Sequence, residues 1–233
     1  MKQHSMFEDE TNNEDKYIRH DGVSDWILKE ICTRYGNVKN ISKEDIFYYV
    51  YGLLHSEEYR TRFVDDLRKS LPRIPIVEKV EDFWAFSKAG RQLAELHLNY
   101  ESVEACPGVT VNEEDSKFKN DEYEYYSVSD KMRFRSGVKA KDKPDTIVYN
   151  GHITVENIPA VAYDYIVNGK SAIEWIMERY AVTVDKDSLI KNDCNDWSKE
   201  HNQPRYILDL LLSVINVSVK TVEIVKGLPK LNL

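Results

Sequence analysis

Residues 46–75, IFYYVYGLLHSEEYRTRFVDDLRKSLPRIP, decide how the first part of this chain folds. Their apolar side chains recur at i, i+3, i+4 and i+7, the spacing of one helix face: Phe47, Val50, Tyr51 and Leu54. Just upstream, Ser42 precedes two acidic residues and has a hydroxyl that can cap a helix start. Pro72 and Pro75 prevent a helix from continuing past them. The stretch therefore predicts a helix, a break near His55, a second helix and a proline-bounded exit.

The same periodicity extends the helical region on both sides of this stretch. The predicted helices lie at residues 24–35, 43–55, 57–70 and 87–97. Ser87 is the predicted cap of the last one. Residues 101–130 give no clear pattern beyond a turn at Pro107-Gly108.

From residue 131 onward, short β-rich segments replace the helical pattern. Residues 146–149 and 152–155 contain β-branched side chains and flank Asn150-Gly151, a pair that tolerates the positive φ angles of a two-residue hairpin turn. Lys131–Arg135 is predicted to add a strand beside this hairpin. A turn at Asn168-Gly169 and helices at 160–166, 171–180 and 204–218 complete the prediction. Helices followed by a small antiparallel sheet packed with helices define an α+β fold.

This order divides the chain into regions. Residues 1–17 form an acidic stretch that we expect to be a mobile leader, residues 18–100 a helical part, and residues 101–233 an α+β part. A chain of 233 residues can bury one good core or two small ones.

The composition argues against several protein classes. Three widely separated cysteines without a C-x-x-C pair favour a reducing, cytosolic setting over a zinc site or a disulfide scaffold. No run of 18 apolar residues is present, so we expect no membrane span. The first fifteen residues lack the apolar core of a signal peptide. We therefore expect a cytoplasmic location.

No residue pattern predicts catalysis. The phosphate-binding G-x-x-x-x-G-K-[ST] loop, the G-x-G-x-x-G loop and the G-x-S-x-G elbow are all missing. Pro144-Asp145 could open a nuclease site, but no later lysine has an acid two positions before it. Residues 185–196 are rich in Asp and Asn, which hold either a metal ion or a turn, and they lack the glycine and glutamate of a calcium-binding loop. We expect no catalytic residue, metal or cofactor in this chain.

Several short sequence blocks occur in this chain in the same order as in one known family. Besides residues 46–75, they are DGVSDW (21–26), FWAFSKAG (83–90), LHLNY (96–100), KMRF (131–134), Ile158-Pro159, YIVNGKSAIEW (165–175), NDCNDW (192–197), PRYILDL (204–210) and Gly227–Pro229. Together they resemble the C-terminal specificity region of single-polypeptide type ISP restriction-modification enzymes. Leu189 and Cys194 depart from this pattern, in which Gly and Pro are usual, and this puts the conformation of that loop in doubt.

The resemblance implies a target-recognition region without catalytic activity of its own. The implied parent carries a nuclease, a helicase-like ATPase and an adenine-N6 methyltransferase, which use Mg²⁺, ATP and S-adenosylmethionine. Residues 18–100 would pack against the methyltransferase domain, and residues 101–233 would read double-stranded DNA. The DNA would be presented so that the adenine can be flipped out for methylation.

The basic segment 131–143 is the predicted DNA contact. Its cations are Lys131, Arg133, Arg135, Lys139, Lys141 and Lys143, a local net charge of +5 with Asp142, although the whole chain carries −8. Arg133 and Arg135 are spaced to share one strand face and reach base edges, since arginine can bond guanine bidentately. Lys170 and Arg179 are further candidates for phosphate contacts. Alternatively, Lys and Arg in this pattern only protect a sheet edge.

Three other hypotheses remain open. The chain could be a structural coupling module between the methyltransferase and the motor, with DNA read elsewhere. It could be a free-standing protein-interaction domain that uses its acidic face. A hydrolase that uses the Asp/Asn cluster at 185–196 is the third.

Overall fold

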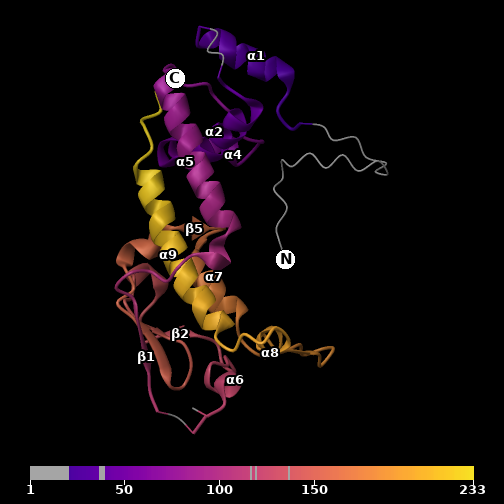
Figure 1. The fold of residues 1–233 in the computed structure, drawn as a ribbon, viewed down its shortest axis with the longest axis vertical. Coiled ribbons are helices and arrows are strands. Elements are labelled where there is room, and N and C mark those ends of the chain that lie inside the picture. The colour runs from indigo at the N-terminus through magenta and orange to yellow at the C-terminus, as the bar shows by residue number, and fades with distance from the viewer. Residues whose placement is uncertain (1–20, 37–39, 116, 119, 136) are drawn as a thin grey trace.

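The computed structural model describes residues 21–36, 40–115, 117–118, 120–135 and 137–233. It confirms the predicted α+β fold, with helices first and small antiparallel sheets after them. Two long helices, α5 (Val80–Leu98) and α9 (Tyr206–Lys226), pack together as the central column of Figure 1. The remaining helices of the first hundred residues gather at one end of this column, and the largest sheet lies near the other end. The predicted leader, residues 1–17, lies outside the described residues.

Four shorter helices form the helical end: α1 (Asp25–Arg34), α2 (Lys43–His55), α3 (Glu57–Arg62) and α4 (Val64–Leu67). The start of α2 is a capping box, because the Ser42 hydroxyl accepts the Asp45 N–H while the Asp45 carboxylate accepts the Ser42 N–H. This local motif explains why the predicted bounds of α2 are correct. The predicted helix 57–70 is instead divided at Phe63, where the backbone leaves the helical region (φ −111°, ψ 21°).

Helix α5 is longer than predicted and begins at Val80. Ser87 does not cap it, because this residue is buried inside the helix and its hydroxyl donates to the Asp45 carbonyl oxygen at 2.9 Å. The two helices α2 and α5 cross closely at Gly52 and Gly90. Around this crossing lies the first hydrophobic core: Ile31, Ile41, Ile46, Tyr49, Leu53, Tyr59, Val77, Phe83, Phe86 and Leu231.

The largest sheet has four antiparallel strands: β1 (Thr110–Glu113), β2 (Arg133–Phe134), β3 (Ile147–Val148) and β4 (Ile153–Glu156). Their order is β1-β4-β3-β2, which leaves β1 and β2 at the edges. The predicted hairpin is the β3–β4 pair, in which Ile147 faces Val155. The short helices between residues 100 and 142 are the 3-10 helices η1 (Tyr100–Ser102) and η2 (Ala140–Asp142), and α6 (Glu122–Tyr125).

The turn of the β3–β4 hairpin differs from the expected two-residue turn. The Tyr149 N–H bonds to the Ile153 carbonyl at 3.0 Å, so three residues, Asn150 to His152, close the loop. The Asn150 side-chain oxygen accepts the N–H groups of His152 and Ile153. Neither Asn150 nor Gly151 has a positive φ. The asparagine therefore stabilises this turn through its side chain rather than through its backbone.

A two-residue turn of the expected kind lies at Asn168-Gly169, with φ angles of 49° and 86°. It joins β5 (Ile166–Val167) to β6 (Lys170–Ser171). Ser171 then caps α7 through a capping box. The elements around it are η3 (Ala160–Asp164), α7 (Ala172–Arg179), β7 (Thr183–Val184), β8 (Lys191–Asn192) and α8 (Asp196–Glu200).

Helix α9 and the tail that follows it connect the two cores. The first half of the helix contributes Leu208, Leu211 and Ile215 to a second core, together with residues of the four-stranded sheet and α7. Beyond it, the tail returns to the helical end, where Leu231 belongs to the first core. The division into regions 18–100 and 101–233 stays a prediction. No helix of the described residues is long and apolar enough to cross a membrane.

Candidate nucleic-acid interface

The basic segment begins at the edge strand β2 and continues through η2. Arg133 pairs with Val148 of β3, and its side chain is exposed. The strand contains only two residues, so Arg135 lies beyond its end instead of sharing a regular strand face with Arg133. Because β2 is an edge strand, protection of the sheet edge remains an alternative role for these cations.

Three of the six cations in the basic segment form ion pairs with carboxylates. The Lys143 ammonium lies 2.6 Å from the Asp164 carboxylate. The Arg135 guanidinium is 3.8 Å from Glu156, and the Lys131 ammonium is 3.9 Å from Glu178. These pairs reduce the positive charge that the three side chains can offer to phosphate.

The other three cations of the segment lack such partners. Arg133, Lys139 and Lys141 are exposed, and none of them forms an ion pair with the described residues. Lys139 directly precedes the short 3-10 helix η2, and Lys141 lies within it. These three side chains are therefore the part of the segment with the most uncompensated positive charge.

Helix α7 brings together predicted cations from distant parts of the sequence. Glu178 bonds Lys170 at 2.6 Å and pairs with Lys131 at 3.9 Å. The hydrogen bond from Lys170 lowers the pKa of the Glu178 carboxyl, which favours its ionised form. The Trp175 ring contacts two cations, with the Lys170 ammonium at 5.3 Å and the Arg179 guanidinium at 5.4 Å from a ring centroid. Three predicted site residues thus share one surface around Glu178 and Trp175.

The same tryptophan fixes the β5–β6 hairpin. Its indole N–H donates to the Val167 carbonyl oxygen at 2.7 Å. Lys170 is on this hairpin and Arg179 is on the last turn of α7. The bond therefore fixes the positions of the two cations relative to each other. The sequence offered Lys170 and Arg179 as separate candidates for phosphate contacts, and only the fold brings them to the same tryptophan ring.

The Asp/Asn-rich residues 185–196 build a turn. One Asp185 carboxylate oxygen accepts the N–H groups of Asp187 and Ser188, at 3.1 and 2.8 Å. Asn195 bonds the backbone of Val128 through both its side-chain oxygen and its side-chain nitrogen. Within the part of the chain that the structure describes, no three His, Cys, Asp or Glu side chains gather in the manner of a metal site.

Two features of the structure were not predicted from the sequence. Arg205 joins Glu113 at 2.8 Å and Asp209 at 3.2 Å, and lies over the Tyr126 ring. The β7–β8 hairpin carries exposed aliphatic side chains. No sequence pattern pairs Arg205 with Glu113, because these residues are far apart along the chain.

A family model described as the Type ISP C-terminal specificity domain matches residues 3–210. The chain belongs to this family. The resemblance read from the sequence blocks is thereby confirmed. The match takes in the basic segment, α7 and the β7–β8 hairpin of this specificity domain. A search of curated proteins found no match.

Solved structures similar to this specificity domain come from much longer chains. The ATP-dependent Type ISP restriction-modification enzyme LlaBIII bound to DNA is 40% identical, with a TM-score of 0.78, over 97% of this chain and 13% of that chain. A nuclease-deletion mutant of the Type ISP enzyme LlaGI, in complex with a DNA substrate mimic, is 45% identical with a TM-score of 0.70, over 83% and 17%. The DrdV–DNA complex is 35% identical with a TM-score of 0.71, over 90% and 20%.

Proposed function

We propose that this chain recognises a specific DNA sequence as the C-terminal part of a restriction-modification enzyme. It positions the target for adenine-N6 methylation and cleavage by other domains. The observation that carries this proposal is the family match over residues 3–210, together with three similar structures that are described as DNA complexes. The chain spans between 13% and 20% of those proteins, so the reactions belong to regions outside it.

The uncompensated cations are the proposed first contact with DNA. Arg133, Lys139 and Lys141 neutralise phosphates and release counterions, and this release supplies sequence-independent affinity. Arg133, exposed at the sheet edge, is also the best placed to bond a base edge in the major groove. The cluster of Lys131, Lys170 and Arg179 extends the same surface and fixes the register of the duplex through phosphate contacts.

The chemistry of the parent is assigned to its other domains. S-adenosylmethionine, ATP and Mg²⁺ serve the methyltransferase, motor and nuclease, and this chain contributes no catalytic group. Such an enzyme acts on DNA in the cytoplasm, which is the location we propose.

The methyltransferase domain is the proposed neighbour of the helical end. Two large aromatic side chains are exposed there, Trp26 on α1 (70%) and Phe47 on α2 (41%). Exposed tryptophan is uncommon on a surface that faces only water, and aromatic side chains are enriched in protein interfaces. Docking of the helical end on the methyltransferase domain is also what the alternative role, that of a coupling module, requires.

The test is a fluorescence-anisotropy titration with mixed-sequence duplex DNA at two salt concentrations. The triple variant Arg133→Ala/Lys139→Ala/Lys141→Ala should weaken binding roughly 10- to 100-fold at low salt and reduce the salt slope by about 3. A matched control removes one arginine and two lysines from the helical end, Arg68→Ala/Lys69→Ala/Lys29→Ala. It should bind like the original chain. Equal weakening by both triples would mean that only net charge matters.

Sequence recognition needs a second measurement. Selection from a random duplex library should enrich a single asymmetric sequence, and Arg133→Ala should relax the choice at one position of it. Absence of DNA binding by the original chain at low salt would overturn the proposal for the chain alone and favour the coupling module.

A further inference from the structure

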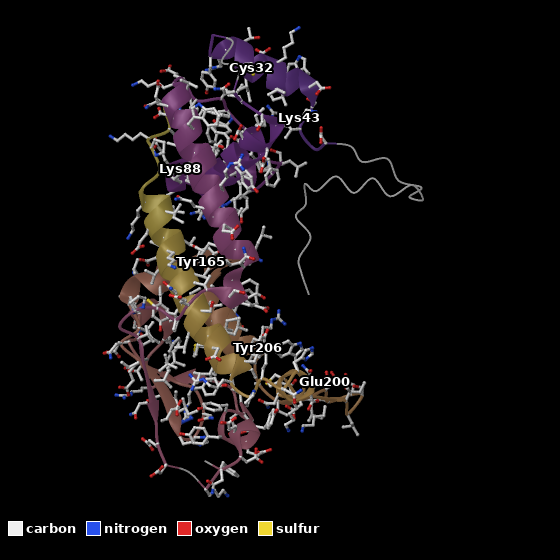
Figure 2. All side chains as sticks on the ribbon, in the orientation of Figure 1. Cys32, Lys43, Lys88, Tyr165, Glu200 and Tyr206 are labelled. Atoms are coloured by element: carbon white, nitrogen blue, oxygen red, sulfur yellow. The ribbon has the colours of Figure 1, made fainter. Side chains whose placement is uncertain are left out.

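The β7–β8 hairpin presents aliphatic side chains to solvent. Val184 is 56% exposed, Leu189 76% and Ile190 67%. In Figure 1 the hairpin and α8 extend sideways from the lower end of the α5–α9 column. Figure 2 places Glu200 of α8 on this extension and Tyr206 at the column itself. Three exposed aliphatic residues at the end of one projecting element indicate an interaction site.

The hairpin tip is held in one conformation. Asp185 and Ile190 close the loop through a backbone bond of 3.0 Å, and the Asp185 carboxylate also accepts the Ser188 hydroxyl at 2.8 Å. The Ser188 hydroxyl oxygen in turn accepts the Ile190 N–H at 3.3 Å. Such a preformed tip loses little conformational entropy when it binds.

The charge around the tip disfavours DNA as its partner. Residues 183–201 contain five acidic side chains and three lysines, a net charge of −2. One of the lysines, Lys191, is already paired with Asp193 at 2.9 Å. The basic segment 131–143, in contrast, carries +5. A duplex would therefore be attracted to the basic segment and repelled by the hairpin.

A groove at the base of the extension continues this acidic surface. It has a volume of about 620 Å³, and its lining includes Glu101, Glu122, Trp197, Arg205, Tyr206 and Asp209. The three carboxylates exceed the single guanidinium, which is itself bonded to Asp209. The Trp197 and Tyr206 rings, whose centroids are 3.9 Å apart, supply aromatic surface. Carboxylates beside aromatic rings suit a lysine or arginine side chain.

We infer that the β7–β8 hairpin and this groove form one docking surface for a protein partner. The partner offers an apolar socket for Leu189 and Ile190 and a basic side chain for the groove. It is the remainder of the parent polypeptide, an assignment that rests on the proposed function. The size of this remainder supports the choice, since the chain spans at most 20% of the similar DNA-bound proteins. In Figure 1, α1 and the hairpin also extend toward the same side of the column, so one body could contact both.

The first experiment compares hydrogen–deuterium exchange at residues 184–192 in the isolated chain and in the intact parent polypeptide, both without DNA. The backbone amides of this hairpin should exchange about 10-fold more slowly in the intact polypeptide. Equal exchange in both would overturn the proposal. Protection that appears only after DNA is added would assign the hairpin to DNA instead.

The second experiment uses Leu189→Ser/Ile190→Ser, with Ile166→Ser, an exposed aliphatic residue of the β5–β6 hairpin, as control. The parent polypeptide without this chain is titrated with each variant. The hairpin variant should bind it about 10- to 100-fold more weakly, and the control should bind unchanged. DNA affinity of the isolated chain should be the same for both variants. Loss of DNA binding in the hairpin variant alone would overturn the inference. If only the triple variant Arg133→Ala/Lys139→Ala/Lys141→Ala loses DNA binding, the inference is supported.

Discussion

His97 of α5 and Thr221 of α9 are joined by a hydrogen bond, with Nε2 and Oγ1 3.0 Å apart. The other ring nitrogen lies 2.8 Å from the Tyr51 hydroxyl of α2, and the ring stacks on Tyr165 with centroids 5.4 Å apart. The imidazole therefore lies where the helical end meets the β5–β6 hairpin and α9. Burial, with a smaller effect from His55, lowers the pKa of His97 to about 4.

This buried histidine predicts loss of stability in mild acid. Its pKa in the folded chain, about 4, is below the ordinary value of 6.5, so the unfolded chain takes up the proton first as the pH falls. The contribution to stability is complete above pH 6.5 and is lost progressively as the pH falls toward 4, about 3 kcal/mol in total. Urea unfolding at several pH values measures it. His97→Gln should flatten this part of the curve, whereas the exposed His201→Gln should not.

Gly90→Ala should destabilise the chain strongly. A Cβ at this position would overlap the carbonyl oxygen of Tyr48, which belongs to the backbone of α2 and has no rotamer through which it could move away. We expect a loss of about 3 kcal/mol or more, or failure to fold. Thermal unfolding measures the effect. Gly151→Ala is the control, because no atom lies within 4 Å of its added Cβ. Similar melting temperatures for both variants would show that the helices do not cross so closely.

The C-terminal tail should stabilise the helical end, although the two are far apart in sequence. Leu231 is 4% exposed in the first core, and its N–H donates to the Glu58 carboxylate at 2.8 Å. Leu231→Ala should cost about 2 to 3 kcal/mol, because it leaves a cavity in that core. Leu233→Ala, which removes a more exposed side chain, should cost far less. Denaturant unfolding of both variants tests the difference.

Glu178→Gln should increase the affinity for DNA. The substitution releases Lys131 and Lys170 from their shared carboxylate, so both cations become available to phosphate. We expect a rise of roughly 3- to 10-fold at low salt, and a smaller rise at high salt because of screening. Glu30→Gln on α1 makes the same charge change far from this surface and should have little effect. Unchanged affinity for Glu178→Gln would place the α7 surface outside the DNA contact.

Local signals explain what the sequence predicted well. The Ser42–Asp45 capping box lies within four residues, and the bounds of α2 follow from it. The Asn168-Gly169 turn is equally local. The start of α5 was wrong because Val80 has no side-chain cap, and Ser87, a plausible cap, is used to bond Asp45 of another helix. The Asn150-Gly151 turn was wrong in detail because the asparagine side chain, rather than the backbone, closes the loop.

By itself, the sequence determined the α+β class, most helices, the family and the residues of the basic segment. These follow from periodicity, capping and short blocks, all of which act within a few residues. Only the tertiary structure decided which cations are already neutralised and which remain free. Lys131 meets Glu178, and Arg205 meets Glu113, because the fold brings together chain segments that are far apart in sequence. Such pairings depend on packing in three dimensions, and no spacing along the chain encodes them.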